Sequence, residues 1–500
     1  MTEPGITSLA PLLVTLIVAL SMRNVLVGLF AGVLVAVIMV SDSGVLMFLP
    51  DLVKDHLVPE VADSYNASVL VLLAFIGGFV KLVETSGGGT AFARAAAHWV
   101  STGARAQIGA WCGGILIFFS DLGTPLIVGP VFQPLMDRLR LSRQKLAFIL
   151  DSTSSPVAIL IPIIGWGVFI MSVIKRAFEA NNVSWNEWDA FIAAIPYQFY
   201  AWLAIMMVPA LTLLRFDYGA MASAERAAKN VAVAEPQSRP QADERATPIL
   251  VWLPLVTLGA ALFAILGPQG FPFEPVSGAN FRAGLSAAYL LAAVVLVVLL
   301  VARGIKSTTE TFATYIQGVT GMMPIAATLV LAWALGSLSE QLGTGVFVAD
   351  IAREGLAGWL LPAVTFLLAA LISFATGSSW GTVIIMMPLA IPAAIATSAD
   401  LAVTIGAVLS GGLFGDHSSP ISETTILSST GAATTPLEHF RTQFPYALTN
   451  GAIAFCVFIV AGLSASPWLT VGAVLLQLSV LLVLRRILRN FHNPQAAEFD

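Results

Sequence analysis

Two short polar segments interrupt an otherwise apolar chain. The first is LDSTSSPVAIL, residues 150–160, and the second is FGDHSSPISET, residues 414–424. Each places one carboxylate, Asp151 or Asp416, shortly before a Ser-Ser-Pro step. A carboxylate with neighbouring hydroxyls offers hard oxygen ligands, which suit an alkali cation better than a soft metal.

Each segment also carries a signal for a broken helix. A Pro at the first helical position after a Ser cap is typical of a helix start, so we expect second half-helices to begin at Pro156 and Pro420. The first half-helices should then end near Ile149 and Gly415. Their free carbonyl groups carry partial negative charge and favour a cation.

Two further polar interruptions could complete a cation shell. They are FFSDLGTP, residues 118–125, and ATGSSWGT, residues 375–382, and each divides a long apolar run. We expect helical hairpins with these tips facing the broken helices. The predicted cation- and proton-binding residues are therefore Asp151, Asp416, Ser154, Ser155, Ser418, Ser419, Ser120, Thr124, Thr376, Ser378, Ser379 and Thr382.

The two aspartates predict a competition between ions. An ionised Asp in the middle of a membrane costs roughly 2.5 to 3.5 kcal/mol on insertion scales, so something must compensate its charge. A bound Na⁺ would do so at Asp151 or Asp416, and so would a proton, because desolvation disfavours the charged form of a carboxylate. One carboxylate holds either ion but not readily both, which is the minimal mechanism of a cation/proton antiporter.

The composition predicts that the bilayer is the solvent. Of the 500 residues, 57% are hydrophobic and 11% charged, and mean hydropathy is +0.87. Apolar runs at 24–41, 190–214, 281–302 and 467–484 are each near the roughly 20 residues that span a membrane. The fold class is therefore an all-α polytopic membrane protein, with a first spanning helix at the N-terminus. Cys112 and Cys456 are predicted to be small core residues. A net charge of −5 with scattered basic residues argues against nucleic acid as a partner.

Positive residues should mark the cytoplasmic side. With the mainly acidic segments 42–66 and 179–189 placed outside, the run 105–136 has basic loops at both ends. A single membrane crossing cannot have both ends in the cytoplasm, but a re-entrant hairpin that opens inward can. A second hairpin, 357–397, would open outward. The basic candidates are Arg23, Arg94, Arg105, residues 137–145, Arg215, Arg226, Lys229, Arg239, Arg245, Arg303, Lys306, Arg441, Arg485, Arg486 and Arg489.

Three motifs recur in the same order in both halves. ETSGGGTAFA at Glu84 resembles EQLGTGVFVA at Glu340, the two hairpin tips share Gly-Thr, and both broken segments contain Ser-Ser-Pro. Opposite hairpin openings make the repeats inverted, the build of many secondary transporters. The predicted divisions are a first membrane repeat (1–214), a cytoplasmic linker (215–247), a second, inverted repeat (248–465), and a last helix with a basic tail (466–500).

The motifs resemble a known family. GDHSSPISETTILSS looks like the signature of the NhaC family of bacterial sodium/proton antiporters, and PLMDRLRLSRQKLAFILDSTSSPV and ATGSSWGT resemble two further stretches of it. The resemblance runs over nearly the whole chain. It implies a multi-pass protein of the bacterial inner membrane that exchanges Na⁺ or Li⁺ for H⁺ by alternating access, with Asp151 and Asp416 as ion-binding acids. It also leaves open a Na⁺- or H⁺-coupled carrier of an amino acid or small organic acid.

Several residues carry two interpretations each. Glu423 could transfer the proton or cap a half-helix, His417 could sense pH or be a satisfied buried histidine, and Asp121 could act as a supporting acid at a hairpin tip. For Glu84 and Glu340, which lie near helix ends beside Gly-rich turns, the favoured interpretation is a solvated helix cap. Trp166 and Trp380 are predicted to pack or gate.

Other functional classes fit the sequence less well. Consecutive Asp416, His417 and Ser418 cannot align as a catalytic triad, and the chain has no HExxH motif, so no enzyme is predicted. No Arg or Lys for clamping a carboxylate cargo occurs in the four broken segments. No cofactor is expected beyond the transported ions, the partners are lipid and small cations, and a homodimer is compatible with the sequence.

Overall fold

A computed structural model describes residues 5–22, 24–41, 48–91, 101–230, 245–271 and 276–492. Within these ranges the regular structure is helical throughout, with no strand. The predicted cytoplasmic markers Arg23, Arg94 and Arg239 lie outside the described residues. The all-α prediction is confirmed for the described part of the chain.

The helices before the central linker, and the one within it, have the following bounds: η1 (Ile6–Leu9), α1 (Ala10–Met22), α2 (Val25–Val40), α3 (Phe48–Asp51), η2 (Leu52–Leu57), α4 (Val58–Ala62), α5 (Ser64–Thr85), α7 (Gly103–Leu116), α8 (Gly123–Arg138), α9 (Arg143–Ser152), α10 (Ser155–Ala158), α11 (Gly165–Ala180), α12 (Glu187–Ala194), η3 (Ile195–Tyr197), α13 (Phe199–Leu214) and α14 (Gly219–Asn230).

The later helices are α15 (Ile249–Leu266), η4 (Gly267–Gln269), α16 (Gly278–Ala302), α17 (Thr308–Gly321), α18 (Met323–Gln341), α19 (Thr344–Gly355), η5 (Gly358–Leu360), α20 (Leu361–Thr376), α21 (Ser379–Thr397), α22 (Leu401–His417), α23 (Glu423–Gly431), α24 (Pro436–Leu463) and α25 (Leu469–His492).

Many of these helices are long enough to cross a membrane. In the described ranges, eight pass the requirements of length and apolar composition, or up to nine if a bent pair is one span. The predicted span at 281–302 lies within α16, and the span predicted at 467–484 begins two residues later, with α25 at Leu469. The run 190–214 is instead bent by 46° between η3 and α13, where Gln198 interrupts the helix. The chain is a multi-pass membrane protein.

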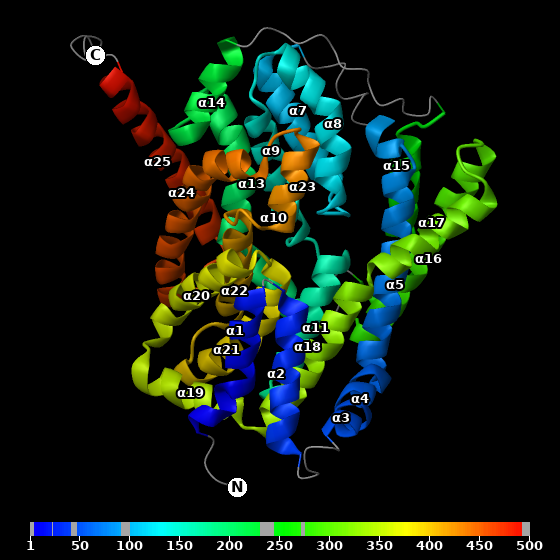
Figure 1. Ribbon diagram of the computed structural model, residues 1–500, viewed down its shortest axis with the longest axis vertical. Coiled ribbons are helices and arrows are strands. Elements are labelled where there is room, and N and C mark those ends of the chain that lie inside the picture. Colours follow the sequence, from blue (N-terminus) through cyan, green and yellow to red (C-terminus); the bar gives the residue numbers. More distant parts are fainter. Residues whose placement is uncertain are drawn as a thin grey trace.

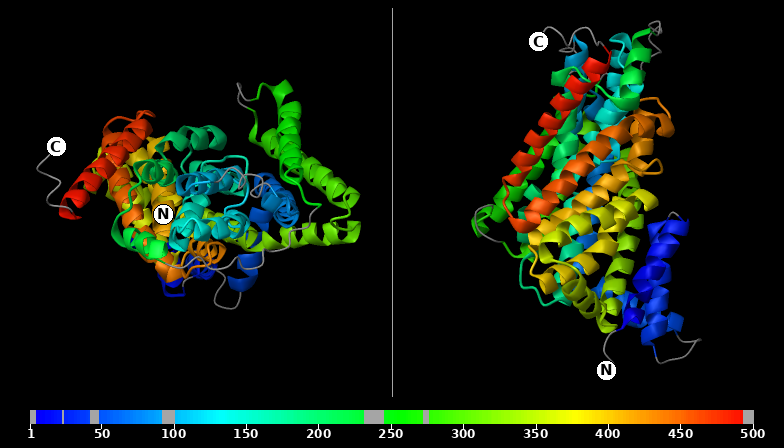
Figure 2. Two further views of the ribbon diagram at one scale, coloured as in Figure 1. Left: turned by 90° about the horizontal axis from the view of Figure 1, so that it is seen from above. Right: turned by 90° about the vertical axis from the view of Figure 1, so that its left-hand side faces the viewer.

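The two ends of the molecule differ in the elements they carry (Figures 1 and 2). Helix α14 and the end of α25 lie at one end, and α3, α4 and α19 lie at the other. The pair α7 and α8 lies in the upper half of Figure 1, whereas α20, α21 and α22 lie in the lower half. The two predicted hairpins thus occupy opposite halves of the molecule.

Both hairpin tips break the helix close to the predicted positions. Helix α7 ends at Leu116 and α8 begins at Gly123, and the two helices pack on each other. In the second pair, α20 ends at Thr376 and Gly377 takes a positive φ of 66°, a conformation that a side chain would strain. Ser378 then caps α21 by accepting the Gly381 N–H at 3.2 Å.

The first two helices differ from the prediction of a spanning helix. Helix α2 has 16 residues, and with its preceding 3₁₀ turn α1 covers only Ile6–Met22, so both fall among the shorter apolar helices. They pack on each other as a pair. The start of α2 lies at the second hairpin tip, because a Cβ on Gly381 would come within 2.3 Å of Val25 Cγ2. The sequence could not show this, since apolar length alone does not distinguish a span from a short buried pair.

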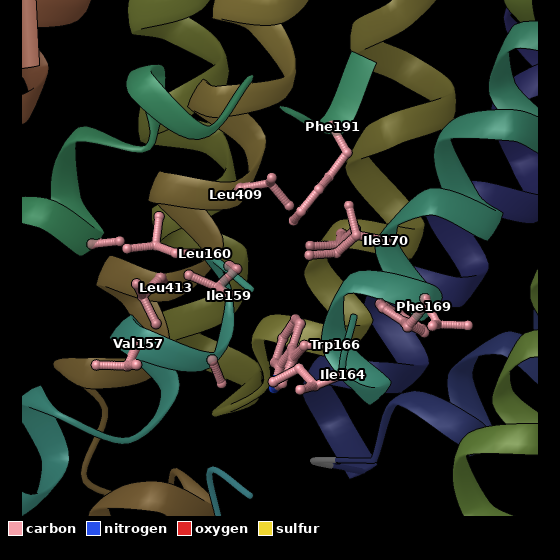
Figure 3. Packing of buried hydrophobic residues seen from close by; sticks show 14 of the residues in the cluster. Val157, Ile159, Leu160, Ile164, Trp166, Phe169, Ile170, Phe191, Leu409 and Leu413 are labelled. Atoms are coloured by element: carbon pink, nitrogen blue, oxygen red, sulfur yellow. The ribbon is translucent and has the colours of Figure 1, made fainter. Parts of the chain in front are cut away.

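The buried core surrounds the first helix break. Figure 3 shows Ile159 and Leu160, from the chain just after α10, close to Leu409 and Leu413 of α22. All four are buried. Contacts of this kind join the two halves of the sequence in one core. The two cysteines are not part of it: Cys112 and Cys456 are exposed on outward faces of α7 and α24, which corrects their assignment to the core.

Candidate functional site

Asp151 and Asp416 occupy matching positions in two interrupted helices. Asp151 is the last residue but one of α9, and Asp416 is the last but one of α22. The breaks therefore fall two or three residues later than predicted, because each helix continues through its aspartate. A carboxylate in the last turn adds its charge to the negative end of the helix dipole, which concentrates negative potential at both breaks.

The restart after each break is less regular than the sequence predicted. Pro156 lies in the first turn of α10, as expected, but α10 has only four residues. Pro420 does not begin a helix. Instead α23 starts at Glu423, and Ser422 is its N-cap residue in extended conformation. The reason lies in the tertiary contact of Ser422, whose hydroxyl donates to Asp416 Oδ1 at 2.6 Å.

Among the described residues, two hydroxyl groups donate hydrogen bonds to the Asp416 carboxylate. Ser422 bonds one oxygen, and Ser379, the first residue of α21, donates to the other at 3.1 Å. Asp416 is buried, and no ion pair with a basic side chain includes it within the described ranges. A carboxylate enclosed by two neutral donors needs a further positive charge.

Asp151 has a different environment. His439 Nε2 lies 3.2 Å and Gln443 Nε2 2.6 Å from Asp151 Oδ2, and His417 Nε2 lies 3.7 Å from the same oxygen. The other oxygen, Oδ1, is buried and has no hydrogen-bond partner within the described ranges. The protein itself thus places two imidazoles and an amide at Asp151 and leaves one carboxylate oxygen free.

One helix connects the two breaks. Gln443 on α24 also donates to the His417 carbonyl oxygen at 2.5 Å. His417 in turn hydrogen bonds through Nδ1 with the Tyr200 hydroxyl at 2.8 Å. Residues of α9, α13, α22 and α24 therefore form one buried polar network. It contains Asp151 itself and His417, the residue that follows Asp416 in the chain.

The first hairpin tip is held by hydrogen bonds. The Ser120 hydroxyl donates to Glu84 Oε1 at 2.7 Å, so Glu84 anchors the tip. The prediction that Glu84 is a solvated helix cap is therefore wrong. The Thr124 hydroxyl donates to the carbonyls of Ile117 and Ser120, both at 2.8 Å. Glu340, its counterpart in the repeat, is exposed as expected.

Two tryptophans join the hairpin tips. Trp166 Nε1 donates to Asp121 Oδ2 at 2.6 Å, which ties the start of α11 to the first tip. The Trp166 ring lies with its centroid 4.0 Å from that of Trp380, next to the second tip. Figure 3 shows Trp166 beside Ile164 at this point. The Trp166 side chain thus contacts both Asp121 of the first tip and Trp380 beside the second tip.

The remaining predicted ligands are close to the breaks, but their hydroxyls bond to backbone. Ser154 donates to the Asp151 carbonyl, Ser418 to the Phe414 carbonyl and Ser419 to the Phe374 carbonyl, while Thr376 and Thr382 donate to carbonyls four residues earlier. Ser155 is buried without a partner. Such hydroxyls keep lone pairs for a cation, so their role as ligands stays a prediction.

Two carboxylates lie at the hairpin tips. Asp121 belongs to the first tip and accepts from Trp166, and Asp416 accepts from Ser379 at the start of α21. Glu423 is exposed and lines a groove of about 480 Å³ with Thr376, Ser378 and Asn24. No hydrogen bond from Glu423 caps α23. This arrangement attracts cations.

Four residues that make these contacts are not predicted from the sequence: Tyr200, Ser422, His439 and Gln443. His439 and Gln443 are four residues apart in an apolar helix and so share one face, which was the available signal. Ser152, Thr425 and Ser428 are also buried with unpartnered hydroxyls, on α9 and on α23, which packs against it. Among the described residues, no group of three His, Cys, Asp or Glu is placed to hold a metal ion.

A multi-pass bundle with carboxylates at two interrupted helices defines a membrane transporter. The chain belongs to the Na⁺/H⁺ antiporter family, whose model matches residues 157–463. It is accordingly a secondary antiporter and not an enzyme.

The relatives carry different cargoes. An uncharacterized protein of Haemophilus influenzae is 30% identical over 476 residues, 92% of each chain. The arginine/ornithine antiporter ArcD of Halobacterium salinarum is 40% identical over 119 residues, 21% of this chain and 23% of that one. The malate-2H⁺/Na⁺-lactate antiporter of Bacillus subtilis is 34% identical over 98 residues, 20% and 21% of the two chains.

Two solved structures share the fold. The YdaH transporter of Alcanivorax borkumensis gives a TM-score of 0.61 at 17% identity, covering 85% of this chain and 90% of that one. MtrF of Neisseria gonorrhoeae gives 0.57 at 13% identity, covering 90% and 94%.

Proposed function

We propose that the protein exchanges Na⁺ or Li⁺ for H⁺ by alternating access, with the two ions competing for Asp416. The observation that carries this proposal is the enclosure of the Asp416 carboxylate by two neutral hydroxyl donors. Its charge must be compensated whenever the site is closed, and either cargo ion provides that compensation. Ser379 and Ser422 have lone pairs to ligate Na⁺ beside the carboxylate.

Asp151 takes a second, different part in this proposal. Its carboxylate faces His417 and His439, and either imidazole would compensate its charge when protonated, so Asp151 needs a cargo ion less than Asp416 does. Its free oxygen Oδ1 is nevertheless available to a cation, together with the unpartnered hydroxyl of Ser155. Exchange at Asp416 and charge sharing at Asp151 would give the two repeats unequal roles.

The predicted inverted repeats belong to the same proposal. The placement of α7 and α8 in one half of the molecule and of α20 and α21 in the other supports it (Figure 1). The divisions at 1–214, 215–247, 248–465 and 466–500 follow, with α14 in the linker on the cytoplasmic side of a bacterial inner membrane. One repeat would then move against the other and present the loaded site to the opposite face.

A carrier of an organic substrate is the alternative. Relatives that are similar over about a fifth of the chain transport arginine and ornithine, or malate and lactate, by their names. The 480 Å³ groove beside Glu423 is large for an alkali ion and would admit such a cargo.

Ion flux in sealed proteoliposomes distinguishes the two proposals. With a trapped pH dye and a clamped membrane potential, Na⁺, Li⁺ or K⁺ is added outside, and proton flux opposite to cation flux is measured. Na⁺-driven flux that is abolished in Asp416→Asn and retained in Glu340→Gln, the exposed control, supports exchange at Asp416. Asp151→Asn tests the unequal roles, because it should reduce flux without abolishing its dependence on Na⁺. If no inorganic cation drives protons in the unmodified protein, the organic carrier becomes the leading proposal.

A further inference from the structure

A second cavity lies between α11, α18, α19 and α21. Its volume is about 160 Å³, and it shares no lining residue with the network around Asp151 and Asp416. Helix α19 lies at the lower end of the molecule in Figure 1, the end opposite α14. The cavity is therefore separate from the proposed exchange site.

The beginning of α19 contributes to the lining. Thr344, Gly345 and Val346 line the cavity, and no side chain caps this twelve-residue helix. The Thr344 hydroxyl donates away from the helix, to the Ser8 carbonyl at 2.8 Å. An uncapped helix start presents backbone N–H groups and partial positive charge to the cavity.

Three side-chain groups in the lining have no hydrogen-bond partner among the residues that the structure describes. They are the Ser339 hydroxyl, the Trp333 indole N–H and the Arg176 Nε, all buried. Ser339 is 7% and Trp333 is 1% exposed. Two of these groups are obligatory donors, and leaving a buried donor unpaired is destabilising. These unpaired donors in the cavity lining would be satisfied by a ligand that carries acceptor oxygens.

The charges around the cavity are nearly balanced. The Arg176 guanidinium pairs with Glu60 at 3.4 Å and with Glu179 at 3.9 Å, and Glu179 also pairs with Lys175 at 2.8 Å. Ser337 makes a further contact with Arg176 and Glu60. Glu340, at the rim, is the remaining acid of the lining. Glu340 would repel a bare anion at the rim and would attract an ammonium group.

Apart from Asn181, the rest of the lining is apolar, and the small volume restricts the ligand to a small molecule. The apolar walls are Val173, Ala177, Ala332, Ile384 and Pro388, and the Asn181 amide donates to the Ala177 carbonyl at 2.8 Å. We propose that this cavity binds a small carboxylate, with its oxygens on Ser339, Trp333 and the start of α19. An uncharged or ammonium-bearing remainder would lie toward the apolar wall and Glu340.

Such a ligand would link the two halves of the chain. Helix α11 precedes the linker, whereas α18, α19 and α21 follow it. A bound carboxylate would therefore fix elements of both repeats against each other. This site goes beyond the proposed ion exchange and does not depend on it.

Calorimetric titration of the purified full chain tests this site. Sodium lactate and L-alanine are the probes, and sodium chloride at equal ionic strength is the reference. Saturable binding of either carboxylate supports the proposal. Tighter binding of alanine than of lactate would indicate that the ammonium group of alanine lies at the rim, near Glu340. Trp333→Phe and Ser339→Ala should each weaken binding about tenfold, the equivalent of one hydrogen bond of roughly 1.4 kcal/mol. Trp359→Phe and Ser479→Ala, at exposed positions, should leave it unchanged.

Three results would overturn the assignment. They are the absence of saturable binding, equal binding in the Trp333 and Ser339 variants, and loss of binding in Asp416→Asn, which would place the carboxylate at the exchange site. Because the readout is heat of binding and not ion flux, its failure is distinguishable from failure of the proposed exchange.

Discussion

The Gln443 side chain donates to Asp151 Oδ2 at 2.6 Å while the same nitrogen donates to the His417 carbonyl at 2.5 Å. One amide of α24 thus contacts the last turn of α9 and the end of α22. Both of its N–H groups are used, so a change at either break alters the bonding at the other.

Replacing Gln443 by Leu should reduce exchange by about ten- to a hundredfold. The substitution removes two hydrogen bonds, and a bond to a charged acceptor is worth roughly 1.5 to 3 kcal/mol. Proton flux in proteoliposomes measures the effect. Gln317→Leu, at an exposed position of α17, is the matched control. Normal flux in a well-folded Gln443→Leu protein would contradict the coupling of the two breaks.

Removing either serine hydroxyl that donates to Asp416 should weaken the affinity for the transported cation. Ser379→Ala and Ser422→Ala each delete one donor to the carboxylate, and we expect the KM for the cation to rise several-fold in each. Ser418→Ala serves as the comparison, because the Ser418 hydroxyl donates to backbone carbonyls. Concentration series of proton flux give the KM values. An effect of Ser418→Ala as large as the other two would mean that Ser418 is also a cation ligand, as predicted from the sequence.

Trp166→Phe should slow turnover more than Trp380→Phe does. Phe keeps a ring in contact with the opposite tryptophan but removes the donor to Asp121, which leaves a half-buried carboxylate without that bond. We expect about a tenfold loss of maximal flux for Trp166→Phe. Equal losses in both variants would mean that the ring contact, and not the hydrogen bond, joins the hairpin tips.

Gly129→Ala and Gly431→Ala should destabilise the fold. A Cβ on Gly129 would lie 2.4 Å from the Gly431 carbonyl oxygen, and one on Gly431 would lie 2.3 Å from the Pro125 carbonyl oxygen. Overpacking of this kind costs roughly 1 to 3 kcal/mol. Gly259→Ala, with open space around it, should be neutral or stabilising because Ala favours helices. Thermal unfolding in detergent checks the contrast, and equal midpoints would refute the close packing of α8 on α23.

Glu225→Gln should change how stability depends on pH. Burial raises the pKa of Glu225 above its usual 4.5, although the Ser142 donors oppose this, Asp217 adds to it and Lys145 lowers it. A raised pKa means that the folded state binds the proton more tightly, so this contribution is full below 4.5 and is lost as pH rises.

The melting temperature of the unmodified protein should therefore fall relative to that of Glu225→Gln as pH increases from 4.5 toward neutrality. Comparing the two proteins at each pH cancels the contributions of other groups. A difference that does not vary with pH would show that Glu225 titrates alike in the folded and unfolded states.

The polar breaks are identifiable from the sequence, but their partners are not. Asp151, Asp416 and Ser379 were identifiable because polar groups stand out in an apolar run. His439 and Gln443 lie almost three hundred residues from Asp151 in sequence, and no local pattern connects them. Ser422 was hidden for another reason, because Pro420 supplied a stronger local signal for a helix start.

The sequence by itself determined that this chain is a membrane protein with interrupted helices, because apolar length and helix-breaking residues act locally. The family followed from motifs in the same segments. Only the tertiary structure decided that the two aspartates differ, one facing imidazoles and the other hydroxyls. The reason is physical: the compensation of a buried charge depends on which distant groups pack against it, and packing is a property of the whole fold.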